Sequence, residues 1–165
     1  MPVRLSVNLN KVALIRNARG SNHPDLIQFA KDCEEFGAQG ITVHPRPDER
    51  HVRFDDLPLL KEVVTTEFNI EGNPTPHFIQ QVLEVKPHQV TLVPDAPDAL
   101  TSDAGWDTIK YKDFLADVIF QLKKSGIRVS LFIDPDNELI AGAKEVGADR
   151  IEFYTGPYAD HYFEN

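Results

Sequence analysis

The sequence predicts an α/β fold in which parallel strands and helices alternate and the sheet curls toward a barrel. Six short runs of β-branched residues alternate with amphipathic stretches of helical period, a pattern typical of parallel strands joined by helical crossovers. Each strand is apolar on one side and polar on the other, whereas strands covered on both faces of an open sheet read as continuous apolar runs. No glycine-rich dinucleotide or P-loop motif follows any strand. The best match is a TIM (β/α)8-type barrel, truncated after about the sixth strand.

The elements follow from local signals along the chain. The first strand is expected over residues 3–9, and the first helix over residues 25–36, which Pro24 precedes and Gly37 ends. Asp134 is expected to cap the helix over residues 137–146. No helix is expected after the last strand. The remaining strands are expected over 40–44, 68–71, 89–93, 128–133 and 150–154, and the remaining helices over 55–64, 76–85, 113–124 and 137–146.

The alternation along the strands sorts their side chains into two faces. The apolar face must meet the helices, and the polar face must line the interior of the barrel. A complete barrel of this type has about 250 residues, whereas this chain has 165. We therefore expect residues 1–165 to form a single domain, an incomplete barrel with two open strand edges. The polar face is expected to hold Ser6, Asn8, Asn10, Thr42, His44, Asn69, Glu71, Thr91, Val93, Ser130, Phe132, Asp134, Glu152 and Tyr154.

Composition narrows the classes of function. The chain has 26 acidic and 17 basic residues, a formal net charge of −9, which argues against nucleic acid or an anionic membrane as the main partner. The single cysteine, Cys33, excludes an internal disulfide and fits a reducing compartment. No apolar run approaches the roughly 18 residues of a membrane span, and the N-terminus lacks the apolar region of a signal peptide. The expectation is a cytoplasmic globular protein.

Candidate catalytic residues lie at the carboxyl ends of the strands, where barrel enzymes place their active sites. His44, Glu71 and Glu152 point into one space, and an imidazole beside carboxylates suits proton transfer. Arg19, Arg46 and His51 suit phosphate; a guanidinium, in particular, binds phosphate oxygens in a forked geometry.

Structural interpretations stand beside these functional ones. His44 and Asn8 are also compatible with hydrogen-bonding roles in the fold, and residues 46–53 with a solvated loop. A metal site built from His44, Glu71 and Glu152 is the weaker alternative, since the sequence has no HxH, HExxH or CxxC spacing. No strand presents an inward lysine for a Schiff base, and Lys11 is only a weak candidate.

Several segments together resemble the pyridoxine 5′-phosphate synthase family. The combination of RNARG with ITVHPRPDERH is the most specific part of this resemblance. The matching segments are Val7-Asn8-Leu9-Asn10, Arg16-Asn17-Ala18-Arg19-Gly20, Gly40-Ile41-Thr42-Val43-His44-Pro45-Arg46, Asn69-Ile70-Glu71, Leu92-Val93-Pro94-Asp95 and Val129-Ser130-Leu131-Phe132-Ile133-Asp134.

The resemblance implies a TIM barrel that condenses 1-deoxy-D-xylulose 5-phosphate with 3-amino-2-oxopropyl phosphate in vitamin B6 biosynthesis, with no metal and no organic cofactor. It also implies a homo-oligomer, commonly an octamer, with small phosphorylated molecules as its substrates. His44 and Glu71 are the implied acid/base pair, and Glu152 is implied to stabilise cationic character. The implied contacts of the deoxyxylulose phosphate are Arg46, His51, Asn10, Lys11 and Thr101, and those of the aminoketone phosphate are Asn8 and Arg19.

The chain departs from the family pattern in two respects. Many members carry Asp-His where this sequence has Asn10-Lys11, which leaves the contacts there open. The family also continues beyond position 165 with a further catalytic histidine and a phosphate-binding turn, so we expect the chain as given to have impaired activity. The alternatives are another sugar-phosphate isomerase or lyase barrel and a non-catalytic phosphate-binding module.

Overall fold

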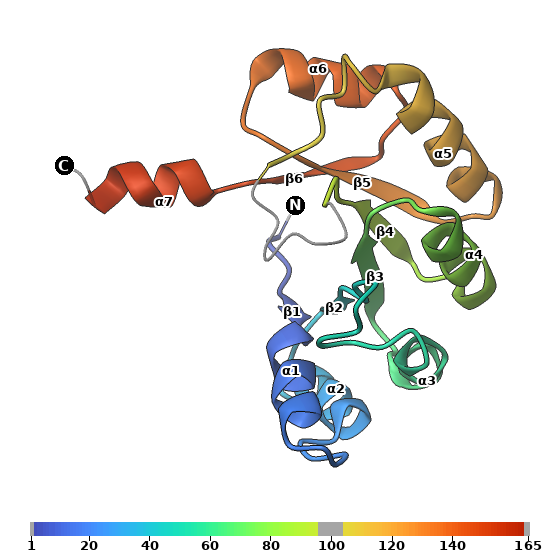
Figure 1. The fold of residues 1–165 in the computed structure, drawn as a ribbon, viewed down its shortest axis with the longest axis vertical. Helices are drawn as coiled ribbons and strands as arrows, with labels where there is room; N and C mark the ends of the chain where they lie inside the picture. The colour runs from blue at the N-terminus through green and yellow to red at the C-terminus, as the bar shows by residue number, and fades with distance from the viewer. Residues whose placement is uncertain (1, 96–103, 164–165) are drawn as a thin grey trace.

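The computed structural model describes residues 2–95 and 104–163, and within these ranges strands and helices alternate along the chain (Figure 1). The strands are β1 (Ser6–Asn8), β2 (Gly40–Val43), β3 (Glu67–Gly72), β4 (Gln89–Leu92), β5 (Arg128–Ile133) and β6 (Arg150–Phe153). The helices are α1 (Asn10–Ala18), α2 (Leu26–Glu35), α3 (Asp56–Val63), α4 (Pro76–Val85), α5 (Lys112–Lys124), α6 (Asn137–Glu145) and α7 (Gly156–Phe163).

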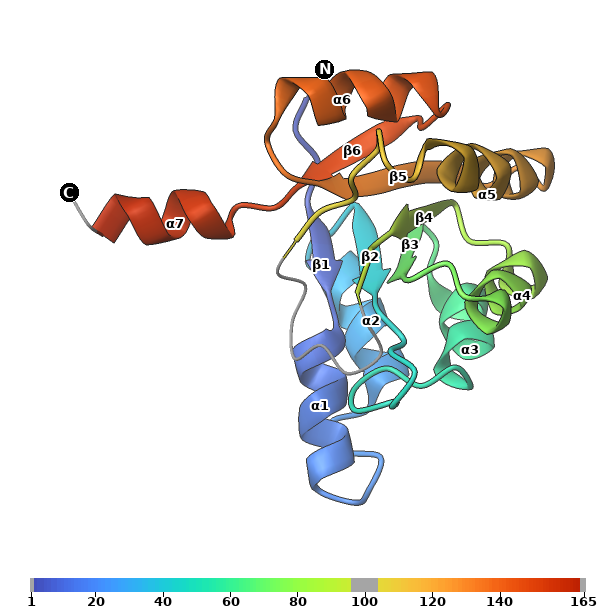
Figure 2. The same cartoon turned by 45° about the horizontal axis from the view of Figure 1, so that its top comes forward.

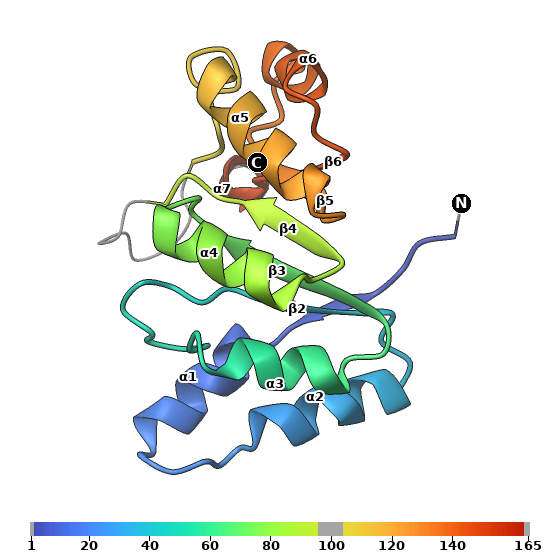
Figure 3. The same ribbon diagram turned by 90° about the vertical axis from the view of Figure 1, so that its right-hand side faces the viewer.

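The six strands form one parallel sheet in the order β1-β2-β3-β4-β5-β6, so every strand pairs with its neighbours in the sequence. A doubly wound sheet would reverse its order at a switch point. The sheet is curled, and helices lie around its outer side (Figures 1 and 2); α2, α3, α4 and α5 are visible together there in Figure 3. This arrangement confirms the predicted TIM-type barrel fold, here open between β1 and β6.

The apolar side of each central strand packs under the helices, as the alternation predicts. Ile41, Phe68, Val90 and Leu131 are fully buried, and burying such side chains contributes about 1.5–3 kcal/mol each. The prediction fails at the sheet edge for Phe153, which is 44% exposed. An edge strand has a neighbour on one side only, so its side chains are less completely covered.

Most helix boundaries follow ordinary capping chemistry. Asp25 accepts hydrogen bonds from the amides of Ile27 and Gln28 at the start of α2, as an N-cap carboxylate does. The cap predicted at Asp134 is wrong. Asp136, directly before α6, caps that helix, and Asp134 instead accepts a hydrogen bond from the amide of Gly105. A cap must immediately precede the first turn, which only Asp136 does.

The helix α1 was not predicted, and it corrects the position of Asn10. The expected strand over residues 3–9 is shorter, because the side chain of Asn8 accepts a hydrogen bond from the amide of Asn10 at 2.9 Å and turns the chain. Asn10 is therefore the first residue of α1 and not a strand residue. Ala13 faces inward from this helix and is fully buried.

The helix α7 was also not predicted, since the sequence after β6 was interpreted as a tail. It leads away from the sheet without covering β6 (Figures 1 and 2), and Tyr158 and Tyr162 on it are 73% and 68% exposed. None of the helices in the described part of the chain is long and apolar enough to cross a membrane.

Candidate active site

The strand register brings His44 level with Glu71. Val43, the last residue of β2, pairs with Ile70 of β3. The residues that come next in the chain, His44 and Glu71, therefore lie at the same end of the sheet. Parallel strands present their carboxyl ends at one edge. The predicted meeting of these two side chains is therefore built into the backbone pairing.

The two side chains approach each other closely and are largely buried. His44 Nδ1 lies 4.0 Å from Glu71 Oε2, with 9% and 14% of the two side chains exposed. This separation exceeds hydrogen-bond length, so the pair does not exchange a proton directly. An atom of a bound molecule between or beside them can contact both.

Burial sets the charge states of this pair. Desolvation, with Arg46 and His51 nearby, lowers the pKa of His44 to about 3. Desolvation also raises the pKa of Glu71 to about 8, and the negative charges of Glu152 and Asp95 add to this effect. At neutral pH the imidazole is therefore uncharged and can accept a proton, while most of the Glu71 carboxyl retains its proton and can donate it.

Two asparagines support the pair from the β1 side. Asn10 Oδ1 accepts a hydrogen bond from the backbone amide of His44 at 2.8 Å, and Asn8 Nδ2 donates to Glu71 Oε2 at 3.5 Å. The Asn8 side chain thus contacts both Asn10 and Glu71, and it is exposed rather than enclosed in the core. Asn10 contacts the backbone beside the imidazole.

Glu152 lies on β6, at the open edge of the sheet. It faces Glu71 closely enough for its charge to raise the pKa of Glu71. Desolvation raises the pKa of Glu152 itself, but its exposure to solvent makes that desolvation less complete than at Glu71. The predicted set His44, Glu71 and Glu152 is thus brought to one region.

Arg46 forms a buried ion pair that the sequence analysis did not assign. Its Nη1 donates to Asp95 Oδ2 at 2.8 Å, with only 4% and 6% of the two side chains exposed. Asn73 Nδ2 in turn donates to the backbone carbonyl of Asp95 at 2.6 Å. Asp95 fixes the direction of the guanidinium. It also offsets the positive charge of Arg46.

His51 lies near His44, with their ring centroids 6.3 Å apart. Desolvation and the charge of Arg46 lower the pKa of His51, and a hydrogen bond to the backbone of His44 opposes the shift. His51 is half-buried. Arg46 and His51, which were predicted to bind phosphate, both lie near His44; their binding of phosphate stays a prediction.

Each member of the pair lines a cavity. One, of about 620 Å³, is lined by His44, Arg46 and Asp95 together with residues of the N-terminal turn of α4. The other, of about 840 Å³, lies on the concave face of the sheet and is lined by Asn8, Glu71, Glu152 and the polar residues below them. His44 thus lines one cavity and Glu71 lines the other, while the two side chains lie 4.0 Å apart.

Two predicted residues are not placed at the pair, and a third is not described. Lys11 and Arg19 are exposed on α1 and at its C-cap, and neither lines the two cavities just described. Thr101 lies outside the described residues. Across residues 2–95 and 104–163, no group of three or more histidine, cysteine, aspartate or glutamate side chains is arranged to hold a metal ion.

Solved structures with a similar fold include crystal structures of mandelate oxidase. One, with (S)-2-phenylpropionate, has a TM-score of 0.62 at 8% identity over 90% of this chain and 54% of its own. A mandelate oxidase mutant has a TM-score of 0.62 at 8% identity, covering 91% of this chain and 50% of that one. At these identities the likeness shows the fold alone.

Sequence comparison identifies the family. Pyridoxine 5′-phosphate synthase of Cytophaga hutchinsonii is 61% identical over 98% of this chain and 68% of its own length. The enzymes of the same name from Phocaeicola vulgatus and Flavobacterium johnsoniae are 59% and 60% identical, and the chain covers 68% and 67% of them. The family model described as pyridoxal phosphate biosynthesis protein PdxJ matches residues 5–165. The chain belongs to the PdxJ family.

Proposed function

We propose that this protein is a pyridoxine 5′-phosphate synthase, which condenses 1-deoxy-D-xylulose 5-phosphate with 3-amino-2-oxopropyl phosphate and releases phosphate and water. The observation that carries the proposal is the buried His44–Glu71 pair, each member of which lines a cavity, in a chain 61% identical to a synthase of that name. Small phosphorylated molecules are its substrates.

The chemistry of this condensation needs both members of the pair. When the amine of one substrate attacks the carbonyl of the other, a C–N bond forms, the nitrogen gives up its protons, and the carbonyl oxygen leaves as water. Glu71, protonated at neutral pH, supplies a proton to the departing oxygen. His44, uncharged at neutral pH, takes a proton from the nitrogen or from carbon during ring closure.

The cavities suggest how the two substrates are divided. Arg46 lines the smaller one, which suits the phosphate of the deoxyxylulose substrate, with His51 beside it. Asn8 lines the concave face, which suits the aminoketone phosphate. Glu152 is placed to stabilise positive charge on the imine nitrogen. In this proposal Asn10 positions His44 by accepting a hydrogen bond from the backbone amide of His44. Lys11, Arg19 and Thr101 are further phosphate contacts.

The test is formation of pyridoxine 5′-phosphate from both substrates by the complete gene product, with the Cytophaga hutchinsonii enzyme as positive control. The expected product requires both substrates, and His44→Ala lowers kcat by about 10²- to 10⁴-fold, the usual contribution of a general acid or base. Turnover of a single sugar phosphate without the aminoketone would identify an isomerase or lyase instead. Phosphate binding without any turnover would indicate a binding module.

A further inference from the structure

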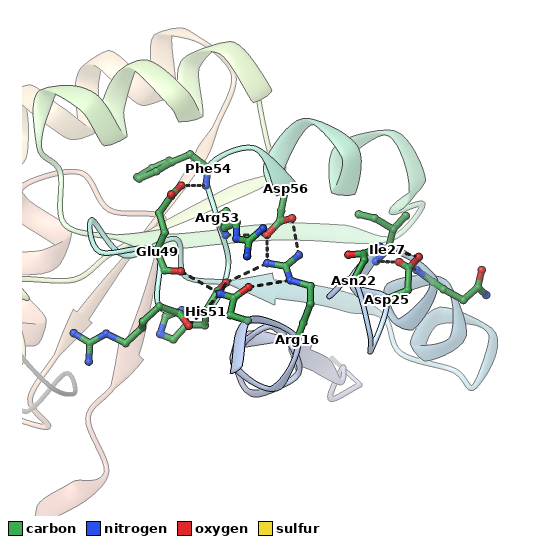
Figure 4. A network of polar contacts seen from close by, with 12 residues as sticks. Arg16, Asn22, Asp25, Ile27, Glu49, His51, Arg53, Phe54 and Asp56 are labelled. Carbon is green, nitrogen blue, oxygen red and sulfur yellow. Dashed lines mark hydrogen bonds and ion pairs between the residues drawn. The ribbon is translucent and has the colours of Figure 1, made fainter. Parts of the chain in front are cut away.

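Arg16 belongs to the basic RNARG segment, yet its side chain is turned into the protein. The residue is only 3% exposed. Its Nη1 and Nη2 donate to Asp56 Oδ1 and Oδ2 at 2.7 and 2.8 Å, a forked pair of the kind that fixes geometry as well as charge. Figure 4 shows the guanidinium of Arg16 between Asp56 and His51. Both terminal nitrogens of Arg16 donate to Asp56, and Arg16 lines neither of the two cavities described above.

Arg16 and its neighbour Asn17, both on α1, hold the segment that follows β2. We call residues 45–52 the β2 loop; a parallel bridge between Pro45 and Val52 closes its base. Asn17 Nδ2 donates to the carbonyls of Glu49, Arg50 and His51 at 3.1, 3.1 and 2.7 Å. Arg16 Nη2 adds a contact to the carbonyl of His51 at 3.3 Å, so His51 is held twice.

The β2 loop has a conformation that needs such support. Glu49 has a φ of 49°, in the left-handed region that side chains other than glycine adopt only when the surroundings enforce it. The Glu49 side chain accepts a hydrogen bond from the amide of Phe54 at 2.9 Å, and Asp56 accepts one from the amide of Arg53 at 2.8 Å. Contacts from both sides therefore fix the chain around His51 (Figure 4).

We propose that Arg16 and Asn17 are positioning residues, which hold the β2 loop so that His51 and Arg46 face the phosphate of the deoxyxylulose substrate. The proposal rests on the proposed function for the identity of that substrate. Neither residue touches the substrate. They act through three consecutive backbone carbonyls and through Asp56, and their effect is confined to the cavity that Arg46 lines.

The test compares Asn17→Asp and Arg16→Lys with the control Glu67→Gln. This control weakens the ion pairs with Arg128 and Arg150 at the amino end of the sheet, opposite to the end that carries His44 and Glu71. Asn17→Asp keeps the shape of the side chain but replaces its donor by an oxygen facing three carbonyls. We expect it to raise KM for 1-deoxy-D-xylulose 5-phosphate by about tenfold or more, with kcat and the KM of the aminoketone changed by less than about threefold. Arg16→Lys keeps the charge but loses the fork, so a smaller rise is expected.

Asn17→Asp has a purely structural effect if it lowers the melting temperature as much as the control does and leaves its own KM for 1-deoxy-D-xylulose 5-phosphate unchanged. That result would overturn the proposal. Asn17→Ser is the substitute if Asn17→Asp does not fold. A second readout does not depend on turnover: the ring signals of His51 in NMR spectra, identified with His51→Gln. They are expected to shift in Asn17→Asp and not in Glu67→Gln, and unchanged signals contradict the proposal. If the unaltered protein makes no product, the proposed function fails, while these signals still decide the positioning role.

Discussion

Glu67 and Glu71 lie on the same strand, four residues apart and on the same polar face, yet their surroundings are opposite. Glu67, at the amino end of β3, forms ion pairs with Arg128 and Arg150, which hold the pKa of its carboxyl below the ordinary value despite partial burial. Glu71, at the carboxyl end, is buried near two further carboxylates, and its pKa is raised to about 8. The same residue type is thus an anion at one end of the strand and a largely protonated carboxyl at the other at neutral pH.

A belt of neutral polar side chains separates the two ends. Asn69, between the glutamates on β3, donates to Thr42 Oγ1 at 3.3 Å and accepts from Thr91 and Gln89 at 3.1 and 3.2 Å. These groups are buried and mutually satisfied, so they add no charge between the ends. The comparison shows that the chemistry of this face is set by the neighbours of each carboxylate and not by the strand that carries it.

The largest expected difference between the two ends is in catalysis. Glu71→Gln removes the proton donor while keeping its shape, and we expect kcat to fall by about 10²- to 10⁴-fold. Glu67→Gln is the matched control, with kcat expected within about twofold of the unaltered protein. Steady-state rates of pyridoxine 5′-phosphate formation measure both. Similar rates in the two variants would remove the distinction between the ends.

The next effect is on the pH dependence of stability. Folding raises the pKa of Glu71 from 4.5 to about 8, so between these values the folded state retains a proton that the unfolded state loses. The free energy of unfolding therefore declines as pH rises through this window. At about 1.4 kcal/mol for each pKa unit, the decline is on the order of a few kcal/mol.

Chemical denaturation of the unaltered protein and of Glu71→Gln between pH 5 and 8.5 measures this decline. Below pH 6.5 His44 contributes the opposite slope, because folding lowers its pKa. Both proteins carry His44, so the difference between their stabilities isolates the contribution of Glu71. The stability difference is expected to shift in favour of Glu71→Gln as pH rises. Parallel curves would mean that the carboxyl is ionised in the folded protein.

The smallest expected effect is the stability contribution of Glu67. Its side chain is 23% exposed, so solvent screens the ion pairs, and Glu67→Gln is expected to lower the free energy of unfolding by about 1 kcal/mol at pH 7. Because folding lowers the pKa of Glu67, this contribution is present above about pH 4.5 and lost as pH falls below it. Denaturation at pH 7 and at pH 3 checks this, and an equal loss at both would point to packing.

The sequence predicted the strands well because their alternation has a simple cause. A strand with one face under helices and the other in the barrel interior must alternate, and the predicted ranges of α4 and β5 coincide with the observed ones. The helix α1 was missed because it buries Arg16 where an amphipathic helix would bury an apolar residue. The helix α7 was missed because it has no buried stripe at all.

The candidate site was predicted where it depends on strand ends, and missed where it depends on loops. His44 and Glu71 follow from the register of adjacent strands. The pairing of Arg46 with Asp95, and of Arg16 with Asp56, joins residues 49 and 40 positions apart. Alternation along a strand carries no information about such contacts, since they depend on how two loops, or the two helices α1 and α3, pack together.

Because strand order equals chain order, the sheet can be assembled in the direction of synthesis. Each new strand pairs with the strand that precedes it in the sequence. The loop that each pairing closes is therefore short, which limits its entropic cost. His44 and Glu71 require only β1, β2 and β3, all within the first 72 residues. The strand pairing that sets His44 beside Glu71 is therefore encoded entirely before Glu152 in the order of synthesis.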